Sequence, residues 1–170
     1  LAMQEACDQN PGTMAAIVGL EDSKIEEICC EINDDVCVAA NYNCPGQLVI
    51  SGSLTGIKKA ETLLLAAGAK RVIILNVGGA FHSPLMSPAK ERLATMIQSI
   101  SFKSPECPIY QNVNSFAQTD SEIIKSNLIQ QLTSPVLWTQ TIQAMLKDGI
   151  TEFIEVGGNG TVLSGFMKRI

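Results

Sequence analysis

The first eighty residues alternate between short apolar runs and segments whose apolar residues recur at helical spacing. Residues 13–20 (TMAAIVGL) form an apolar run with a glycine near its end, and its length is typical of a buried strand. Residues 21–32 begin with acidic side chains, which the positive end of a helix dipole favours. Their apolar residues then recur at helical spacing (Ile25, Ile28, Cys29, Ile32). The pattern predicts a strand followed by a helix.

A second strand and helix pattern follows. Residues 36–52 contain two β-rich runs split by NCPG, whose proline and glycine mark a turn, so we expect a hairpin. Residues 53–69 carry apolar residues on one helical face and a glycine near the end, and residues 70–77 read as another strand. The order β-α-β-β-α-β over residues 13–77 predicts a ferredoxin-like unit, a four-stranded antiparallel sheet with two helices on one face. That architecture alone names no function.

The pattern changes after Val77. We expect a helix over 84–99, a short strand within 107–115 and two helices over 120–138 and 138–150. A buried strand over 152–158 and a last helix from 161 complete the series. Alternating strands and helices of this kind indicate the α/β layering of a second unit over residues 78–170.

Composition and charge narrow the class of protein. The 170 residues are 46% hydrophobic and 17% charged, and no apolar run approaches the roughly 18 residues of a membrane span. We therefore expect a compact soluble protein that does not bind membranes. A net charge of −5 argues against nucleic acid as a partner, because phosphate binding needs clustered Lys and Arg. The first residues carry no secretory pattern.

Six cysteines are present, at positions 7, 29, 30, 37, 44 and 107. The hydrophobic content is ample without disulfides, so we expect reduced, mostly buried thiols and a cytoplasmic location. No Cys-x-x-Cys pair occurs and there is one histidine, so the sequence argues against a zinc site.

That histidine, His82, lies in the stretch GGAFHSPLM. Imidazole is the side chain whose ordinary pKa allows proton transfer near neutral pH, so His82 is a candidate general base; a structural histidine is the alternative. Gly78 and Gly79 predict a tight turn before it, and Pro84 suits the first turn of the helix that follows. His82 is therefore expected at a strand-to-helix crossover.

Four stretches in order, ANYNCPGQLVISG, GAFHSPLM, QQLTSPVLW and FIEVGGNGTVLSGFMKRI, resemble the malonyl-CoA:acyl carrier protein transacylase family. The resemblance covers essentially the whole chain. It implies an α/β-hydrolase-like large subdomain with a ferredoxin-like small subdomain inserted in it. Residues 1–12 would then end a large-subdomain segment and linker, residues 13–77 would be the small subdomain, and residues 78–170 the C-terminal part of the large one.

The resemblance also implies the chemistry. In this family a serine within GxSxG attacks the thioester of malonyl-CoA, and the phosphopantetheine thiol of acyl carrier protein then takes the malonyl group; coenzyme A enters as substrate and no cofactor is expected. His82 matches the base, and a main-chain carbonyl in the segment that matches Gln131 would orient its ring. Gln131 as a helix-surface amide remains the alternative. Phe81 would exclude a methyl branch on the acyl group, or would simply be a core aromatic residue.

Two further residues match positions at the edge of the cleft, and two basic residues are candidates for charge steering. Asn43 and Gln47 flank the predicted hairpin turn, where they would contact the pantetheine arm or serve only as turn residues. Lys70 and Arg71 would attract the phosphates of coenzyme A and an acidic carrier protein, or would be solvated surface charges.

The sequence holds no GxSxG, and its nearest string, GSLTG at 52–56, has serine in the wrong place. We therefore expect the C-terminal portion of the enzyme, with the base but without the nucleophile or the arginine that pairs with the malonyl carboxylate, and inactive by itself. An acyltransferase domain of a multienzyme, polyketide-type synthase and a non-catalytic ferredoxin-like binding module are the alternatives. In a plastid-bearing host the location would be the organelle stroma instead of the cytoplasm.

Overall fold

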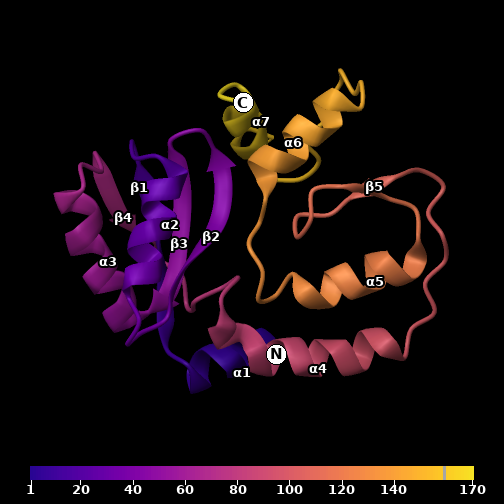
Figure 1. Cartoon of the computed structure of the whole chain (residues 1–170). Helices are drawn as coiled ribbons and strands as arrows, with labels where there is room; N and C mark the ends of the chain where they lie inside the picture. Colours follow the sequence, from indigo (N-terminus) through magenta and orange to yellow (C-terminus); the bar gives the residue numbers. More distant parts are fainter. Residues whose placement is uncertain (159) are drawn as a thin grey trace.

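The computed structural model describes residues 1–158 and 160–170. Its main sheet has four strands, β1 (Gly12–Val18), β2 (Cys37–Cys44), β3 (Gln47–Ser53) and β4 (Arg71–Ile74), in the order β2-β3-β1-β4. Every neighbouring pair is antiparallel. Helices α2 (Asp22–Glu31) and α3 (Leu54–Ala66) follow β1 and β3, and Figure 1 shows them beside the sheet. The predicted ferredoxin-like unit is confirmed.

Strand alternation explains why the two faces of this sheet bury different residues. One face packs under α2 and α3, and its centre is fully buried (Ala15, Ile17, Ile25, Leu48, Ile50, Ile57, Leu64). The intervening strand residues point to the opposite face, where Met14, Ala40 and Val49 form a smaller buried cluster. The hairpin between β2 and β3 turns at Gly46, whose φ of 72° is a left-handed conformation that glycine adopts without strain.

A third buried cluster lies beyond the end of the sheet. Helix α1 (Ala2–Gln9) packs against the short helix η1 (Pro84–Met86) and the start of α4 (Ser87–Gln98), where Ala6, Cys7, Met86 and Ala89 are buried together. The sequence pattern did not predict α1. The helix expected over 84–99 is present, but its first turn is a tighter 3₁₀ turn.

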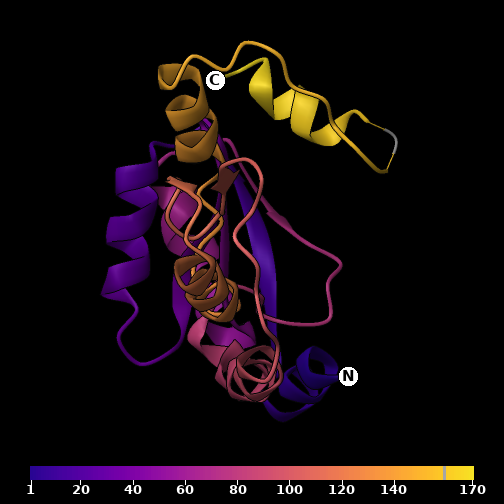
Figure 2. The same ribbon diagram turned by 90° about the vertical axis from the view of Figure 1, so that its right-hand side faces the viewer.

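The remainder contains a short β5–β6 ladder (Ile109–Tyr110 with Ala117–Gln118) and the helices α5 (Ser121–Gln130), α6 (Trp138–Lys147) and α7 (Val162–Met167). Helices α4 and α5 lie one above the other at the right of Figure 1, and the quarter turn in Figure 2 places both away from α7. The structure matches the predicted α/β class. The helix expected over 120–138 ends at Gln130, before the chain reaches Pro135.

The strand predicted over 152–158 is absent from the structure, and that prediction is wrong. Residues 152–156 are irregular, with Ile154 and Val156 about nine-tenths exposed. No strand among the described residues pairs with this segment. Glu155 instead turns its carboxylate to the start of α7, where it accepts hydrogen bonds from Leu163 N and Ser164 N at 3.1 and 3.0 Å.

A connecting segment, residues 131–137, ties α5 to the edge of the main sheet. Val136 N donates to the Ala40 carbonyl at 2.8 Å, and Tyr42 N donates to the Val136 carbonyl at 2.9 Å, which makes one parallel bridge to β2. Figure 1 shows this segment running from α5 up to α6 alongside β2. The segment therefore fixes the position of Gln131 relative to the small sheet.

All six cysteines are free thiols; four are buried and two, Cys30 and Cys107, are exposed. The burial agrees with the expectation of mostly buried thiols. Among the helices of the described residues, none combines the length and the apolar character that a membrane crossing requires.

Candidate active site

His82 sits in a tight turn between β4 and η1. Its backbone φ is 58°, the left-handed region that a non-glycine residue occupies only at a cost of about 1–3 kcal/mol. The turn is closed by Ser83, whose buried hydroxyl donates to the Ala80 carbonyl at 2.7 Å and accepts from Leu85 N at 3.2 Å. The serine therefore holds the backbone on both sides of the histidine.

The two glycines before this turn act differently from the sequence-based expectation. Neither Gly78 nor Gly79 has a positive φ, and the residue in the left-handed conformation is His82 itself. Gly79 is required for another reason: a Cβ there would overlap with the Cys7 side chain of α1. Close approach to α1, and not backbone flexibility, accounts for that glycine.

The His82 ring is oriented by a main-chain oxygen. Its Nδ1 lies 3.1 Å from the Gln131 carbonyl. Because a carbonyl oxygen can only accept, Nδ1 must carry the proton in this contact, which leaves Nε2 of the neutral ring as the proton acceptor. The ring is partly buried and is thus held in one tautomer and one orientation.

The Gln131 side chain stabilises the segment that supplies this carbonyl. Its Nε2 donates to the carbonyls of Ser134 and Pro135, each at 3.1 Å. Gln131 therefore touches His82 through its backbone, while its amide shapes the turn after α5. It is partly buried, so the reading as a free surface amide does not describe its environment.

Phe81 packs between the two smaller clusters. Its ring contacts the cluster of Cys7 and Met86 on one side and the cluster of Met14 and Val49 on the other. It is partly exposed, so the structure is compatible both with a core role and with a face toward a bound acyl group.

Asn43 and Gln47 lie at the hairpin end of β2 and β3. Gln47 Oε1 accepts a hydrogen bond from Arg169 Nη1 at 3.0 Å, and Arg169 Nη2 donates to the Pro45 carbonyl at 2.7 Å. The end of α7 is thereby fastened to the hairpin turn. Sequence reasoning did not single out Arg169, although the basic pair at 168–169 was visible in the sequence.

Lys70 and Arg71 are exposed at the start of β4. Arg71 pairs with Val18, which pairs with Gln47, so these three residues form a row across the hairpin end of the sheet. The turn with His82 lies toward the other end, because a Cβ on Gly12 would meet the Cβ of Ala80 at 2.7 Å. Six residues of strand separate Gly12 from Val18, roughly 20 Å. The two basic residues are therefore remote from His82.

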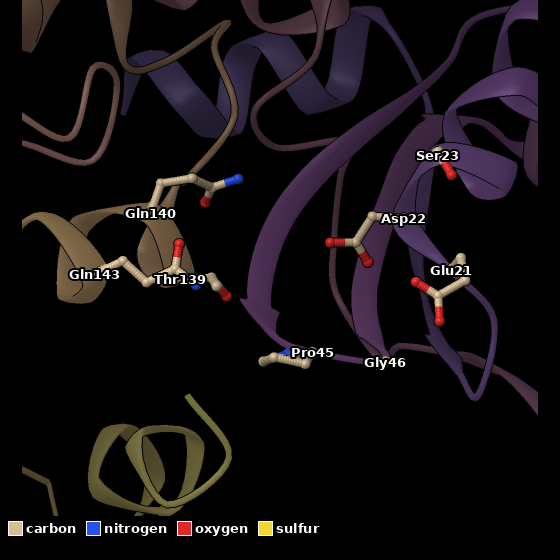
Figure 3. Close-up of a pocket in the computed structure, with 8 residues that line it drawn as sticks. All are labelled: Glu21, Asp22, Ser23, Pro45, Gly46, Thr139, Gln140 and Gln143. Carbon is tan, nitrogen blue, oxygen red and sulfur yellow. The ribbon is translucent and has the colours of Figure 1, made fainter.

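A cavity of about 360 Å³ opens between the start of α2 and α6, and Figure 3 shows Glu21 and Asp22 on one side, Gln140 and Gln143 on the other, and Pro45 at the hairpin turn. Burial raises the pKa of the Asp22 carboxyl, and the neighbouring Glu26 and Glu21 raise it further. His82 does not line this cavity. Gln131 instead lines a smaller one of about 210 Å³ with Tyr110 and Asn127.

The charged and nucleophilic side chains of the described residues form no group of three His, Cys, Asp or Glu placed to hold a metal ion. A partly buried imidazole with a fixed Nδ1–H and an available Nε2 can accept a proton from a hydroxyl or thiol and return it. Such a group activates a nucleophile that another segment supplies.

This arrangement, a ferredoxin-like unit beside a turn that holds a backbone-oriented histidine, coincides with one known class of protein. Residues 2–168 match the model of the acyl transferase domain family, and the chain belongs to that family.

Particular relatives carry a more specific name. The chain is 39% identical over 170 residues to the malonyl CoA-acyl carrier protein transacylase of Bacillus subtilis, covering 99% of the chain and 53% of the relative. It is similar to the crystal structure of an acyl carrier protein S-malonyltransferase from Vibrio cholerae, with 40% identity, a TM-score of 0.93 and coverage of 99% and 55% of the two chains. The chain thus spans about half the length of the relatives it matches.

A third relative was solved with its carrier protein. It is a malonyl-transacylase in complex with a type II polyketide acyl carrier protein, 36% identical with a TM-score of 0.94, and the similarity covers 99% of this chain and 54% of that one. The resemblance inferred from the four sequence stretches is confirmed by these comparisons.

Proposed function

We propose that these residues form part of an acyltransferase that moves malonyl groups from coenzyme A to the phosphopantetheine thiol of an acyl carrier protein, with His82 as the general base. The observation that carries the proposal is the contact between His82 Nδ1 and the Gln131 carbonyl at 3.1 Å, in a turn that the Ser83 hydroxyl closes. The names of the relatives supply the substrate and the acceptor.

In the first half-reaction His82 Nε2 takes the proton of a serine hydroxyl as the serine oxygen attacks the malonyl thioester carbonyl. The carbon–sulfur bond then breaks, and the imidazolium returns the proton to the departing coenzyme A thiol. Nδ1–H remains on the Gln131 carbonyl throughout, so the ring does not turn away. The serine comes from outside these 170 residues, since they contain no GxSxG.

In the second half-reaction the same nitrogen takes the proton of the carrier-protein thiol. The thiolate attacks the malonyl-serine ester, the carbon–oxygen bond breaks, and the proton returns to the serine oxygen. The two steps use one base in opposite directions, which suits an imidazole ring, because its nitrogen can both accept and return a proton. The reaction balances without a redox cofactor or metal, and we propose that none is used.

The same proposal gives roles to four further candidate residues. Asn43 and Gln47, at the hairpin, would contact the pantetheine arm, while Lys70 and Arg71 attract the phosphates and the acidic carrier protein. Residues 13–77 would be the small subdomain and residues 78–170 part of the large one. We propose a cytoplasmic site of action, in line with the thiol content.

The proposal is tested with a fusion protein, in which the N-terminal part of the Bacillus subtilis relative that this chain does not match precedes residues 1–170. The assay follows transfer of labelled malonyl from coenzyme A to phosphopantetheinylated carrier protein. We expect turnover by the fusion and none by either part alone. A folded fusion that does not transfer malonyl would contradict the proposal.

The type of carrier protein is a separate question that the same fusion answers. The relative solved with a polyketide carrier protein makes an enzyme of polyketide synthesis the second candidate. Comparing kcat/KM for a fatty-acid carrier protein and a type II polyketide carrier protein distinguishes the two. We expect the fatty-acid carrier to be preferred; a preference for the polyketide carrier would favour the second candidate.

A further inference from the structure

Two buried thiols face each other between α2 and β2, away from the turn with His82. Cys29 Sγ, near the end of α2, lies 3.6 Å from Cys37 Sγ, at the start of β2, and the thiols share a hydrogen bond. Both residues are about 5% exposed. A disulfide needs an S–S separation of about 2 Å, so closing the gap requires a movement of roughly 1.5 Å, within the reach of side-chain rotation.

The segment that joins the two cysteines can accommodate this movement. It consists of seven residues, 30–36, and Asn33, Asp34 and Asp35 form an irregular connection after α2. Because Val36 and Asp35 are hydrogen-bonded to the start of α3, the approach of the two sulfur atoms relies on rotation of the two cysteine side chains.

A cavity gives a small oxidant access to the pair. Its volume is about 330 Å³ and both sulfur-bearing residues line it. Glu26 and Tyr42 line it as well, and their side chains are joined by a hydrogen bond from the tyrosine hydroxyl to the carboxylate. Cys30, also on the lining, is exposed, so the cavity reaches the surface.

The shared hydrogen bond makes the two thiols unequal. The pKa of Cys37 is lowered because a hydrogen bond from Cys29 stabilises its thiolate, although burial opposes this. The pKa of Cys29 is raised by the same hydrogen bond, by burial and by the negative charges of Cys37, Cys30 and Glu26. In an oxidation of this pair, Cys37 would therefore act as the nucleophile and Cys29 as the resolving thiol.

We propose that Cys29 and Cys37 are a redox-sensitive thiol pair that a hydroperoxide converts to an intramolecular disulfide linking α2 to β2. The inference does not depend on the acyltransferase proposal, because neither thiol touches His82 or its supporting segment. A metal site is not the better explanation, since among the described residues no third ligand joins the pair.

The oxidation balances in two steps. The Cys37 thiolate attacks one oxygen of hydrogen peroxide, the O–O bond breaks, and the departing hydroxide takes a proton to leave as water, which gives a sulfenic acid. The sulfur of Cys29 then attacks the sulfenic sulfur, its proton goes to the leaving hydroxide, and a second water departs. Two thiols and one hydrogen peroxide thus give one disulfide and two waters.

The test exposes the purified protein to hydrogen peroxide under native conditions, alkylates the remaining thiols after unfolding and maps the products by mass spectrometry. Digestion must cut after Glu31, because no Lys or Arg lies between the two cysteines. We expect a cross-linked product joining Cys29 and Cys37 that has lost two hydrogen atoms, and its reversal by a dithiol reductant.

Cys44 is the internal reference, because it is buried but has no thiol beside it within hydrogen-bonding distance, and burial raises its pKa. We expect Cys37 to be consumed at least roughly tenfold faster than Cys44. Equal rates, or separate oxidation of Cys29 and Cys37 without a cross-link, would overturn the proposal.

Two variants separate the pair from its neighbour. Cys30→Ser should leave the cross-link intact, whereas Cys29→Ser should let a sulfenic-acid reagent label Cys37. A cross-link from Cys37 to Cys30 or Cys107 in the unaltered protein would contradict the proposal. Since the cross-link map of that protein decides the question, a variant that folds poorly does not remove the test.

Discussion

At the scale of single residues, the Ser83 hydroxyl determines whether the His82 backbone can remain in its left-handed conformation. Ser83→Ala leaves the Ala80 carbonyl and the Leu85 N–H without their shared partner inside the protein. We expect a loss of stability of about 1–3 kcal/mol in urea unfolding. In the fusion we also expect a fall of roughly tenfold in kcat with little change in KM, because a displaced His82 affects proton transfer more than binding.

Ser87→Ala is the matched control for that substitution. The Ser87 hydroxyl makes an equivalent 2.7 Å bond to the Pro84 carbonyl, but this bond is exposed and lies after the turn. Its removal should leave kcat unchanged. Equal losses in both variants would mean that the effect is one of general stability and not of histidine position.

Phe81 permits a test of acyl-group selectivity at the same scale. Phe81→Ser removes the ring beside His82, so a methyl branch on the acyl group should meet less steric overlap. We expect the ratio of kcat/KM for methylmalonyl-CoA to that for malonyl-CoA to rise by about tenfold. The ratio is the proper measurement, since the loss of packing against Met86 and Val49 also lowers the amount of folded protein. An unchanged ratio would mean that Phe81 only packs in the core and does not select the acyl group.

At the scale of elements, the Asp35 carboxylate stabilises the first turn of α3. Asp35 accepts hydrogen bonds from Ser53 and Thr55, both at 2.7 Å, and pairs with Lys59 at 2.9 Å. The hydrogen bond from Ser53, followed by those from Lys59 and Thr55, lowers the pKa of Asp35 to about 2. This is below its unfolded value of about 3.9, so the stabilisation is complete above that pH and disappears as the pH falls toward 2.

Asp35→Asn should therefore lower the melting temperature at pH 7 and flatten the dependence of stability on pH between about 4 and 2. Asp34→Asn is the comparison, because Asp34 is more exposed and contacts Lys59 without Ser53 or Thr55. Thermal unfolding measured across that pH range gives the answer. If the melting temperature of Asp35→Asn changed with pH as steeply as that of the unaltered protein, the Asp35 carboxylate would not be the source of the pH dependence.

The same scale shows what a sequence pattern can and cannot predict. Strands β1 to β4 were predicted, because their alternating residues pack against α2 and α3, which are near them in sequence. The strand expected over 152–158 has the composition of a strand, but none of the described strands pairs with it. The pattern of apolar residues carries no information about which strand will pair with a segment. Helix α1 is short and its apolar and polar residues do not form a clear helical repeat, so the sequence did not predict its packing against α4.

The site was partly predictable for similar reasons. The residue types of His82 and Pro84 indicate a base at a helix start. The left-handed backbone of His82 and the role of Ser83 as the residue before the 3₁₀ turn depend on how the chain closes in space. Serine directly before Pro-Leu was the available signal, since serine is a preferred N-cap residue.

At the scale of the whole molecule, His82 and the basic residues lie toward different ends of the small sheet. Lys70, Arg71 and Arg169 belong to its hairpin end, with Arg71 in the same row as Gln47 and Arg169 bonded to Gln47. This separation suits a substrate whose reacting thioester and phosphates stand at opposite ends of a long arm. Because the chain has a net charge of −5, this group of basic residues differs in charge from the rest of the molecule and can attract anionic ligands to one place.

Reversing both charges, as Lys70→Glu with Arg71→Glu, should raise KM for the carrier protein in the fusion by roughly tenfold at low salt while kcat changes little. The difference should shrink above about 0.5 M salt, because screening removes the steering. Lys90→Glu with Lys103→Glu is the control for net charge. An equal effect of the control pair, or none from the first pair, would leave Lys70 and Arg71 as solvated charges.

The central claim is that His82 activates the nucleophile through a ring held by the Gln131 carbonyl. The most direct measurement is the pre-steady-state rate at which the fusion becomes malonylated by malonyl-CoA, compared between the unaltered sequence and His82→Ala. Our account predicts a decrease of about 10²–10⁴-fold with the fold intact by circular dichroism. A rate within a factor of about two of the unaltered fusion would show that another group removes the proton.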